Sequence, residues 1–259
     1  MCDNMLLIKI GGSAIENLEE ILSDLPNENL VIVHGGAKKV TQIAKSMGII
    51  QKFVVSPSGY RSRYTDEKTI EIFQMVIAGK INKDIVRILL KFGRKSVGLC
   101  GIDNSIVVSE KKKKIIVVEE GKKKLVDGGY TGRIKKIDIE FIQSLLKNSI
   151  IPVIGSVAIS EEFEPLNINA DSLAVKMASE LDSDQLVFFT DTDGILDKDG
   201  NTIKTIKLSQ LGNLNVGYGM KRKLFEIAKS EADRIIIANG LKDNPFSKFR
   251  GTVIENDRR

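Results

Sequence analysis

The chain is poor in cysteine and histidine and has no long hydrophobic run. Its two cysteines, Cys2 and Cys100, are too few and too distant for a disulfide framework or for a zinc site of about four ligands, so we interpret both as free thiols. No apolar stretch approaches the roughly 20 residues that span a bilayer, and the first residues carry no basic, signal-like segment. We therefore expect a cytoplasmic protein that has no membrane partner.

Two further absences exclude particular kinds of site. No Gly-x-Gly-x-x-Gly follows the first apolar run, which argues against a dinucleotide-binding dehydrogenase. Asp197, Asp199 and Gly200 resemble part of a calcium loop, but the spacing and the terminal glutamate of an EF-hand are missing. What is present is a chain of 259 residues with 42% hydrophobic and 28% charged residues. This composition indicates a single ordered domain, residues 1–259, with two lobes at about 1–165 and 166–259.

Apolar runs and amphipathic stretches alternate along most of the sequence. We expect strands at 5–10, 30–34, 96–100, 150–154, 185–190 and 234–238. We expect helices near 15–25, 37–47, 67–92, 138–147, 170–181 and 219–231. This alternation requires crossover connections and predicts an α/β fold, a three-layer α/β/α open sandwich around a mainly parallel sheet. The β-branched stretches at 50–65 and 105–136 predict added β-hairpins at the sheet edge or above it.

The positive charge of the chain, +5 overall, is concentrated in residues 110–136. This segment has ten lysines and arginines against four acidic residues. A solvated lysine-rich turn explains such a run. An acidic protein partner is the alternative, because a patch of one sign raises encounter rates and selects partners. A nucleic-acid interface would need interleaved aromatic residues or a known motif, and we expect none.

Glycines follow the first two expected strands. Lys9-Ile10-Gly11-Gly12 comes at the end of the strand at 5–10, and Gly35-Gly36-Ala37 follows the strand at 30–34. Glycines let backbone N–H groups approach an anion that a side chain would exclude, and Lys9 supplies positive charge. Two such strand ends predict one anionic reacting centre held from two sides.

Two polar motifs accompany the expected helix at 67–92. Arg63 presents a planar pair of donors suited to a substrate carboxylate, although a surface salt bridge is the alternative for an arginine taken alone. Thr65 or Asp66 is placed to cap the helix. Asn82-Lys83 indicates a helix break or a packing feature.

The segment before the expected helix at 170–181 contains Asn167, Asn169 and Asp171. Asp171 either favours the N-terminal helix dipole as a capping residue or orients catalytic lysines by charge pairing. Asn167 offers both a donor and an acceptor to an amide or to an amino acid backbone.

Two glycine-containing turns follow in the C-terminal part of the chain. The strand at 185–190 ends in Thr190-Asp191-Thr192-Asp193-Gly194, which borders a nucleotide or is ordinary turn chemistry. Gly219-Met220-Lys221 opens an amphipathic helix and places a lysine beside unpaired N–H groups, an arrangement suited to phosphate.

In this order the motifs resemble those of the amino acid kinase family, most closely its acetylglutamate kinase branch. The matching motifs extend over nearly the whole chain: Lys9-x-Gly11-Gly12, His34-Gly35-Gly36, Arg63-x-Thr65-Asp66, Asn82-Lys83, Asn167-x-Asn169-Ala170-Asp171, Thr190-Asp191-x-Asp193-Gly194 and Gly219-Met220-Lys221. The resemblance implies that an acidic amino acid derivative binds the N-terminal lobe and ATP binds the C-terminal lobe. The γ-phosphoryl group then passes to a side-chain carboxylate. Mg²⁺ would arrive with ATP, without dedicated metal ligands in the protein.

The resemblance also assigns roles to particular residues, with Lys9 and Lys221 on two sides of the transferring phosphoryl group. The catalytic residues would be Lys9, Lys221 and Asp171. The substrate-binding residues would be Gly35, Gly36, Arg63 and Asn167. The nucleotide-binding residues would be Gly12, Thr190, Asp191, Asp193, Gly194, Gly219 and Met220.

Within the branch, residues 58–66 and 128–133 resemble archaeal kinases that act on glutamate or α-aminoadipate linked through the amino group to a small acidic carrier protein, LysW. These kinases serve arginine and lysine biosynthesis. Such a partner would match the basic segment at 110–136. Free N-acetylglutamate is the alternative substrate, and a non-catalytic ligand-sensing or carrier-docking module is the alternative from another class. The resemblance also implies a homodimer through residues 67–92, without an arginine-sensitive hexamer.

Overall fold

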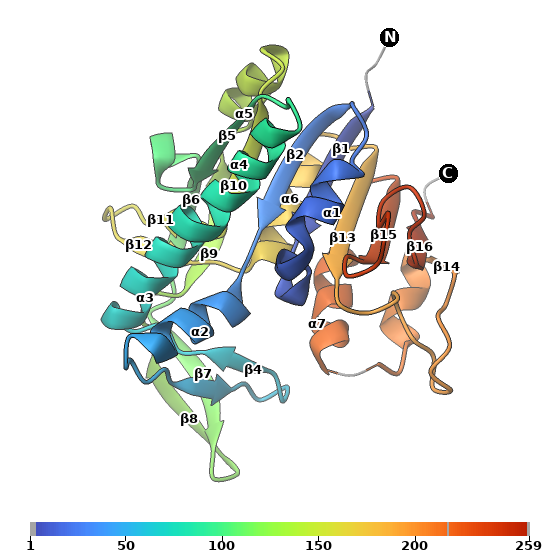
Figure 1. The fold of residues 1–259 in the computed structure, drawn as a ribbon. Coiled ribbons are helices and arrows are strands. Elements are labelled where there is room, and N and C mark those ends of the chain that lie inside the picture. The colour runs from blue at the N-terminus through green and yellow to red at the C-terminus, as the bar shows by residue number, and fades with distance from the viewer. Residues whose placement is uncertain (1–3, 217, 258–259) are drawn as a thin grey trace.

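The computed structural model describes residues 4–216 and 218–257. Within them, the centre of the molecule is an eight-stranded sheet in the order β14-β16-β15-β13-β1-β2-β10-β5 (Figure 1). In that order the strands are Thr205–Lys207, Gly251–Glu255, Arg234–Asn239, Gln185–Thr190, Met5–Ile10, Asn29–His34, Ile151–Gly155 and Ser96–Cys100. Among these strands, β15 and β16 form the antiparallel pair and the other neighbours are parallel. The expected mainly parallel sheet is confirmed, and β14 and β16 extend it beyond the expected strands.

Helices cover both faces of this sheet, as expected for a three-layer sandwich. One face carries α1 (Leu18–Ser23), α2 (Ala37–Ser46), α3 (Glu67–Gln74) and α4 (Asn82–Lys91). The other face carries α5 (Ile139–Lys147), α6 (Ala170–Glu180) and α7 (Tyr218–Ile227). Short 3₁₀ turns are η1 (Gly12–Asn17), η3 (Asp103–Ser105) and η4 (Leu208–Asn213). No helix in 4–216 or 218–257 has both the length and the apolar composition that a membrane crossing requires.

Alternation along the central strands divides the core into two halves. Leu6 and Ile8 of β1 are buried under α1 and α4, whereas Leu7 is buried on the α6 face. Successive side chains on a strand point to opposite faces. Lys9 therefore shares the α6 face with Leu7, and this alternation determines which helix can supply its partner.

The two stretches expected as hairpins contribute strands to two small four-stranded sheets, one of which also contains β11 and β12. One has the order β12-β11-β6-β9, and the other has the order β4-β3-β7-β8. The first contains Pro165–Asn167, Val157–Ile159, Val107–Lys111 and Gly132–Ile137. The second contains Arg61–Arg63, Phe53–Val55, Lys114–Glu119 and Lys122–Asp127, and it extends from the body of the molecule below α2 in Figure 1. The long loop at 50–65 thus pairs with the basic hairpin at 114–127.

The helix expected at 67–92 is interrupted. A seven-residue π-helical segment, η2 (Met75–Ile81), separates α3 from α4. A π-helical turn contains more residues than an α-helical turn, so it changes the phase of the helix that follows. The segment brings Ile77 and Ile81 against Gly36, and it directly precedes the fully buried Asn82. The expected packing role of Asn82 is confirmed, and the period of the hydrophobic pattern alone did not reveal the wider turn.

Candidate active site

The two glycine-rich turns lie side by side at the carboxyl edge of the sheet. β1 and β2 are parallel neighbours, with Ile10 paired to His34, and the Gly35 N–H donates to the Ile10 carbonyl at 3.1 Å. Ligands bind at this edge in open α/β sheets. The structure therefore brings together Gly12, Gly35 and Gly36, as the sequence predicted for one centre.

Two glycines of these turns, Gly11 and Gly36, have no room for a side chain. A Cβ at Gly11 would overlap with Nζ of Lys9, whose side chain folds across the turn. Gly36 has a φ of 150°, and a Cβ there would overlap with Cδ1 of Ile81. Glycine tolerates both the backbone angle and the close approach. The turns are thus shaped around a lysine and a packed helix as well as around a ligand.

Lys9 forms a buried ion pair with Asp171. Its Nζ lies 2.8 Å from Oδ1 of Asp171, and the lysine is only 7% exposed. Asp171 belongs to the first turn of α6, whose N-cap is Asn169, since Oδ1 of Asn169 accepts from the Ser172 N–H at 2.8 Å. The structure therefore assigns the capping role to Asn169, and Asp171 is directed to the lysine.

Lys223 is a second lysine at this centre, and the sequence analysis missed it. Burial lowers the pKa of its ammonium group to about 8; Asp171 and Asp191 raise this pKa, whereas Lys9 lowers it further. Its Nζ lies 5.4 Å from the centre of the Phe188 ring. Lys223 thus lies within electrostatic reach of the Lys9–Asp171 pair. The run Lys221-Arg222-Lys223 contained the signal, but the notable residue in the sequence was Lys221, the lysine next to Gly219-Met220.

Two predicted residues of α7 remain predictions. The side chain of Lys221 and the surroundings of Gly219 lie outside the described part of the structure. Met220, at the start of the same helix, is partly buried against the core on the α6 face.

Arg63 and Asn167 line the cleft in front of the glycine turns. The Nη2 group of Arg63 donates to the Ala37 carbonyl at 2.7 Å and to Oγ1 of Thr41 at 2.8 Å. Its Nη1 group is buried and has no hydrogen-bond partner among the described residues. The Nη2 group therefore anchors Arg63 to α2 through two hydrogen bonds, instead of forming the surface salt bridge that was the alternative. Asn167 donates from Nδ2 to Oγ1 of Thr65 at 2.9 Å, which leaves its carbonyl oxygen for a ligand.

Thr65 and Asp66 follow Arg63 at the start of α3. The Thr69 N–H donates to Oδ1 of Asp66 at 2.9 Å, so Asp66 is the N-cap that the sequence predicted.

The turn after β13 borders the same centre on the side of Gly12. A carboxylate oxygen of Asp191 lies 4.0 Å from the position that a Cβ of Gly12 would occupy. Asp193 accepts from Nδ2 of Asn239 at 2.6 Å, and Gly194 has a φ of 91°. Asp191 therefore faces the site, whereas Asp193 and Gly194 fix the shape of the turn. Thr190 donates from Oγ1 to Asp191 at 3.3 Å.

The glycine turns, Lys9, Asp171, Arg63 and Asn167 line one cleft of about 1940 Å³, whereas the turn at 190–194 and Lys223 are not among its lining residues. Its lining includes Lys9, Gly11, Gly12, Gly35, Gly36, Arg63, Asn167 and Asp171. Across the described residues, no three His, Cys, Asp or Glu side chains are grouped so that they could hold a metal ion. Backbone N–H groups at glycine turns, together with lysines, are suited to binding phosphate groups.

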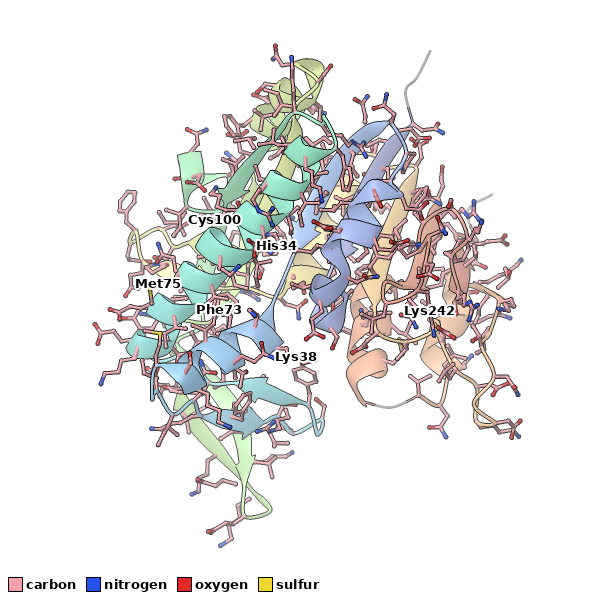
Figure 2. All side chains as sticks on the ribbon, in the orientation of Figure 1. His34, Lys38, Phe73, Met75, Cys100 and Lys242 are labelled. Atoms are coloured by element: carbon pink, nitrogen blue, oxygen red, sulfur yellow. The ribbon has the colours of Figure 1, made fainter. Side chains whose placement is uncertain are left out.

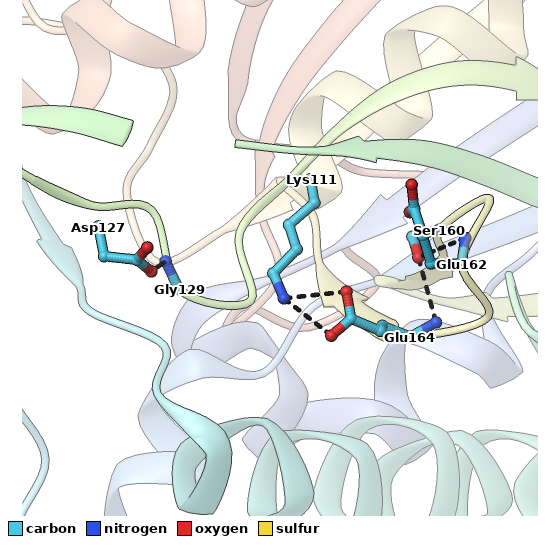
Figure 3. A network of polar contacts seen from close by, with 6 residues as sticks. All are labelled: Lys111, Asp127, Gly129, Ser160, Glu162 and Glu164. Carbon is cyan, nitrogen blue, oxygen red and sulfur yellow. Dashed lines mark hydrogen bonds and ion pairs between the residues drawn. The ribbon is translucent and has the colours of Figure 1, made fainter. Parts of the chain in front are cut away.

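The basic segment at 110–136 is partly neutralised by the protein itself. Nζ of Lys111 lies 2.8 and 2.9 Å from the two carboxylate oxygens of Glu164, while Ser160 and Asp127 hold the neighbouring turns through backbone N–H groups (Figure 3). Further ion pairs are Lys124–Glu119, Arg133–Glu110 and Lys135–Glu161. Four exposed lysines of the hairpin form no ion pair in the described structure, namely Lys113, Lys114, Lys122 and Lys123. The basic surface is therefore smaller than the sequence suggested and centred on β7 and β8.

A parallel sheet whose carboxyl edge gathers lysines and glycine turns defines a protein that handles phosphate groups. Residues 4–239 match the model of the amino acid kinase family, and the chain belongs to this family. The expectation of a kinase is thereby confirmed.

Curated relatives match nearly the whole chain. It is 40% identical over 263 residues to the [LysW]-aminoadipate/[LysW]-glutamate kinase of Sulfurisphaera tokodaii, an alignment that covers 96% of this chain and 100% of the relative. It is 37% identical over 265 residues to the kinase of the same name from Saccharolobus solfataricus, with 97% and 100% covered. A solved N-acetylglutamate synthase from Neisseria gonorrhoeae, complexed with coenzyme A and N-acetyl-glutamate, has a TM-score of 0.81 at 20% identity. That match covers 99% of this chain and 60% of the synthase, and it supports the expected fold class.

We predict that Gly11→Ala lowers kcat by about 10-fold or more, because the methyl group would displace Nζ of Lys9 from Asp171. Steady-state kinetics and a thermal melt measure the two effects separately. Gly212→Ala, which meets no atom within 4 Å and, like Gly11, has no positive φ, is the control for a glycine replaced without a clash. Wild-type kcat in the Gly11 variant would show that the position of Lys9 does not limit the reaction.

Proposed function

We propose that this kinase phosphorylates the side-chain carboxylate of glutamate, of α-aminoadipate or of both, while the amino group of that substrate is linked to an acidic LysW-type carrier protein. ATP is the phosphoryl donor. The observation that carries this proposal is the 37–40% identity, over nearly the full length, to two kinases named for these substrates. The reaction would serve arginine and lysine biosynthesis in the cytoplasm.

In the proposed reaction, a carboxylate oxygen of the substrate attacks the γ-phosphorus of ATP. The bond from that phosphorus to the β–γ bridging oxygen breaks, and its electron pair leaves with ADP, so the product is an acyl phosphate. Lys9 and Lys223 neutralise the charge on the transferring group, and Asp171 orients Lys9 through their ion pair. The N–H groups of the glycine turns add fixed dipoles. Phosphoryl transfer depends mainly on such positioning and charge neutralisation.

The two lobes would divide the substrates between them. Arg63 would bind the main-chain carboxylate of the amino acid through its free Nη1 group, and Asn167 would accept from the amide that joins it to the carrier. The turn at Thr190–Gly194 and the start of α7 would border the nucleotide. Mg²⁺ would reach the site with the ATP phosphates and screen their charge.

The direct test supplies ATP with either carrier-linked glutamate, carrier-linked aminoadipate or free N-acetylglutamate, and traps the acyl phosphate with hydroxylamine. We expect product with at least one carrier-linked substrate and little with the free acetylated one. Efficient turnover of free N-acetylglutamate alone would instead establish the alternative, an acetylglutamate kinase.

The three lysines of the site can be distinguished by alanine substitution. We predict that Lys9→Ala and Lys223→Ala each lower kcat by about 10²-fold or more, because each removes a preorganised charge from the transition state. Lys221→Ala tests the residue that the sequence pattern singled out. Kinetics on folded variants, verified by circular dichroism, measure the effect. A large loss in the Lys221 variant with full activity in the Lys223 variant would reverse the assignment.

The lowered pKa of Lys223 predicts a pH dependence. Its ammonium group is charged below about pH 8 and neutral above it. Since the charged form stabilises the transition state, kcat/KM should fall as pH rises through about 8, earlier than for an ordinary lysine. Lys223→Arg keeps its charge at all these pH values, so its descending limb should move to higher pH. Identical limbs in the two proteins would exclude Lys223 as the titrating group.

The unpaired lysines of the hairpin should recruit the acidic carrier. Replacing Lys113, Lys114, Lys122 and Lys123 with serine is expected to raise KM for the carrier-linked substrate and to leave KM for ATP nearly unchanged. The wild-type KM should also rise with salt, since the Debye length falls from about 10 Å at 0.1 M to about 3 Å at 1 M. Two exposed lysines elsewhere on the surface, Lys147 and Lys242, are controls. An unchanged KM at low salt would remove this surface from the interaction.

We also propose a homodimer that uses the α3–η2–α4 stretch. Exposed apolar side chains lie along it, including Met75 at 54%, Leu90 at 55% and Phe92 at 40%; Met75 lies on the outer side of the molecule in Figure 2. Multi-angle light scattering should give a dimer that Leu90→Lys with Met75→Lys dissociates. A monomeric wild-type protein would contradict this arrangement.

A further inference from the structure

A buried polar network lies directly behind the glycine turn at Gly35–Gly36. His34 is the sole histidine of the chain and is fully buried at the end of β2, behind the α3–α4 stretch in Figure 2. Its Nε2 lies 3.1 Å from Nδ2 of Asn82, and its Nδ1 lies 3.0 Å from the Gly35 carbonyl oxygen. Neither His34 nor Asn82 lines the cleft.

The chemistry of the neighbours fixes the orientation of the Asn82 amide. Lys83 is a donor only, and its Nζ lies 3.2 Å from Oδ1 of Asn82 and 2.8 Å from the Gly98 carbonyl. Oδ1 of Asn82 is therefore the acceptor. Nδ2 of the same amide lies 3.1 and 2.9 Å from the carbonyl oxygens of Leu99 and Val153, which only accept.

This orientation of Asn82 determines the tautomer of His34. The Gly35 carbonyl beside Nδ1 can only accept, and the amide nitrogen of Asn82 beside Nε2 cannot accept, so the ring proton of the neutral imidazole must be on Nδ1. The Nδ1–H group then donates to the Gly35 carbonyl. Burial lowers the pKa of the imidazole to about 4, and the ammonium groups of Lys9 and Lys83 contribute in the same direction, so the ring is neutral at physiological pH.

The anchored carbonyl sets the direction of the next N–H group. In a trans peptide the C=O and N–H bonds point to opposite sides. With the Gly35 carbonyl held toward His34, the Gly36 N–H points away from the buried network, and both glycines line the cleft. We propose that His34, oriented by Asn82, is a positioning residue that fixes the Gly36 N–H as a donor to the transferring phosphoryl group.

The direction of the Gly36 N–H needs such an anchor because both residues of this peptide are glycines. Gly35 and Gly36 lack the Cβ atoms that would limit their backbone angles, so a free Gly35–Gly36 peptide can rotate. A hydrogen bond to its carbonyl holds the donor in place before the reaction, and preorganised donors are the ones that accelerate phosphoryl transfer. The inference rests on the phosphoryl-transfer reaction proposed above, but its first test does not.

The first test is nuclear magnetic resonance of the wild-type protein labelled with ¹⁵N in histidine. Because the chain has a single histidine, its two ring nitrogens give unambiguous signals. We expect a protonated Nδ1 and an unprotonated Nε2 at pH 7, with no titration down to about pH 5. A protonated Nε2, or an imidazolium at pH 7, would overturn the proposal whether or not the kinase assignment is right.

The second test compares His34→Asn with His34→Leu. Both variants lose the contact with Asn82, but the asparagine amide can still donate near the Nδ1 position. We expect His34→Leu to lower kcat by about 10- to 100-fold with the KM for ATP changed by less than about 3-fold. We expect His34→Asn to keep kcat within about 3-fold of the wild type. Ile85→Ala is the stability control, because it truncates a buried side chain of α4, the helix that begins at Asn82. It should lower Tm without lowering kcat.

A purely structural role predicts a different pattern. In that case kcat in the two histidine variants would follow their melting temperatures, and the asparagine would give no rescue. Equal losses of kcat in both variants, or wild-type kcat in His34→Leu, would contradict the proposal. If neither variant folds, the tautomer measurement on the wild type still decides it. If the wild-type protein shows no kinase activity, the proposed function fails while the tautomer result stands.

Discussion

The ion pair between Lys9 and Asp171 is the interaction around which the cleft is built. Lys9 points to the α6 face because alternation along β1 places it there, and Asp171 meets it from the first turn of α6. A buried charge is costly unless it is paired. Gly11 has no Cβ because Lys9 lies across it, and Asn169 rather than Asp171 caps the helix. The identities of these residues thus follow from one buried contact.

This contact contributes more to chemistry than to stability. Breaking a buried ion pair is destabilising, but the pair itself gains little over a well-packed apolar contact because both ions lose their hydration. Lys223 lies within electrostatic reach of the same pair, where Asp171 and Asp191 raise the pKa of its ammonium group. Burial is the main cause that lowers this pKa to about 8, and the charge of Lys9 lowers it further. Such a centre is complementary to a phosphoryl group, whose charge it neutralises without reorganising.

The sequence predicted a structural feature best where that feature depends on a single strand or a single turn. Strand β1 and the glycines after it followed directly from an apolar run and from Lys9-Ile10-Gly11-Gly12, because these features depend on neighbouring residues only. The π-helical segment before Asn82 was not predicted; within it, Ile77 and Ile81 pack on Gly36, a contact that is distant in sequence. Periodicity likewise could not show that Lys223 lies within electrostatic reach of Asp171, since this depends on how α7 packs beside α6. The sequence also counted Lys111 in the positive charge of residues 110–136, but Glu164, in the connection between β11 and β12, forms an ion pair with it.

The central claim is that Lys9 acts on the transition state and not on the bound nucleotide. Isothermal titration calorimetry with ADP alone, and with ADP plus aluminium fluoride and the acceptor substrate, separates the two in the wild type and in Lys9→Met. The account predicts that Lys9→Met binds ADP within about 3-fold of the wild type but loses about 10²-fold or more of its affinity for the fluoride complex. Equal affinities of the two proteins for that complex would contradict it.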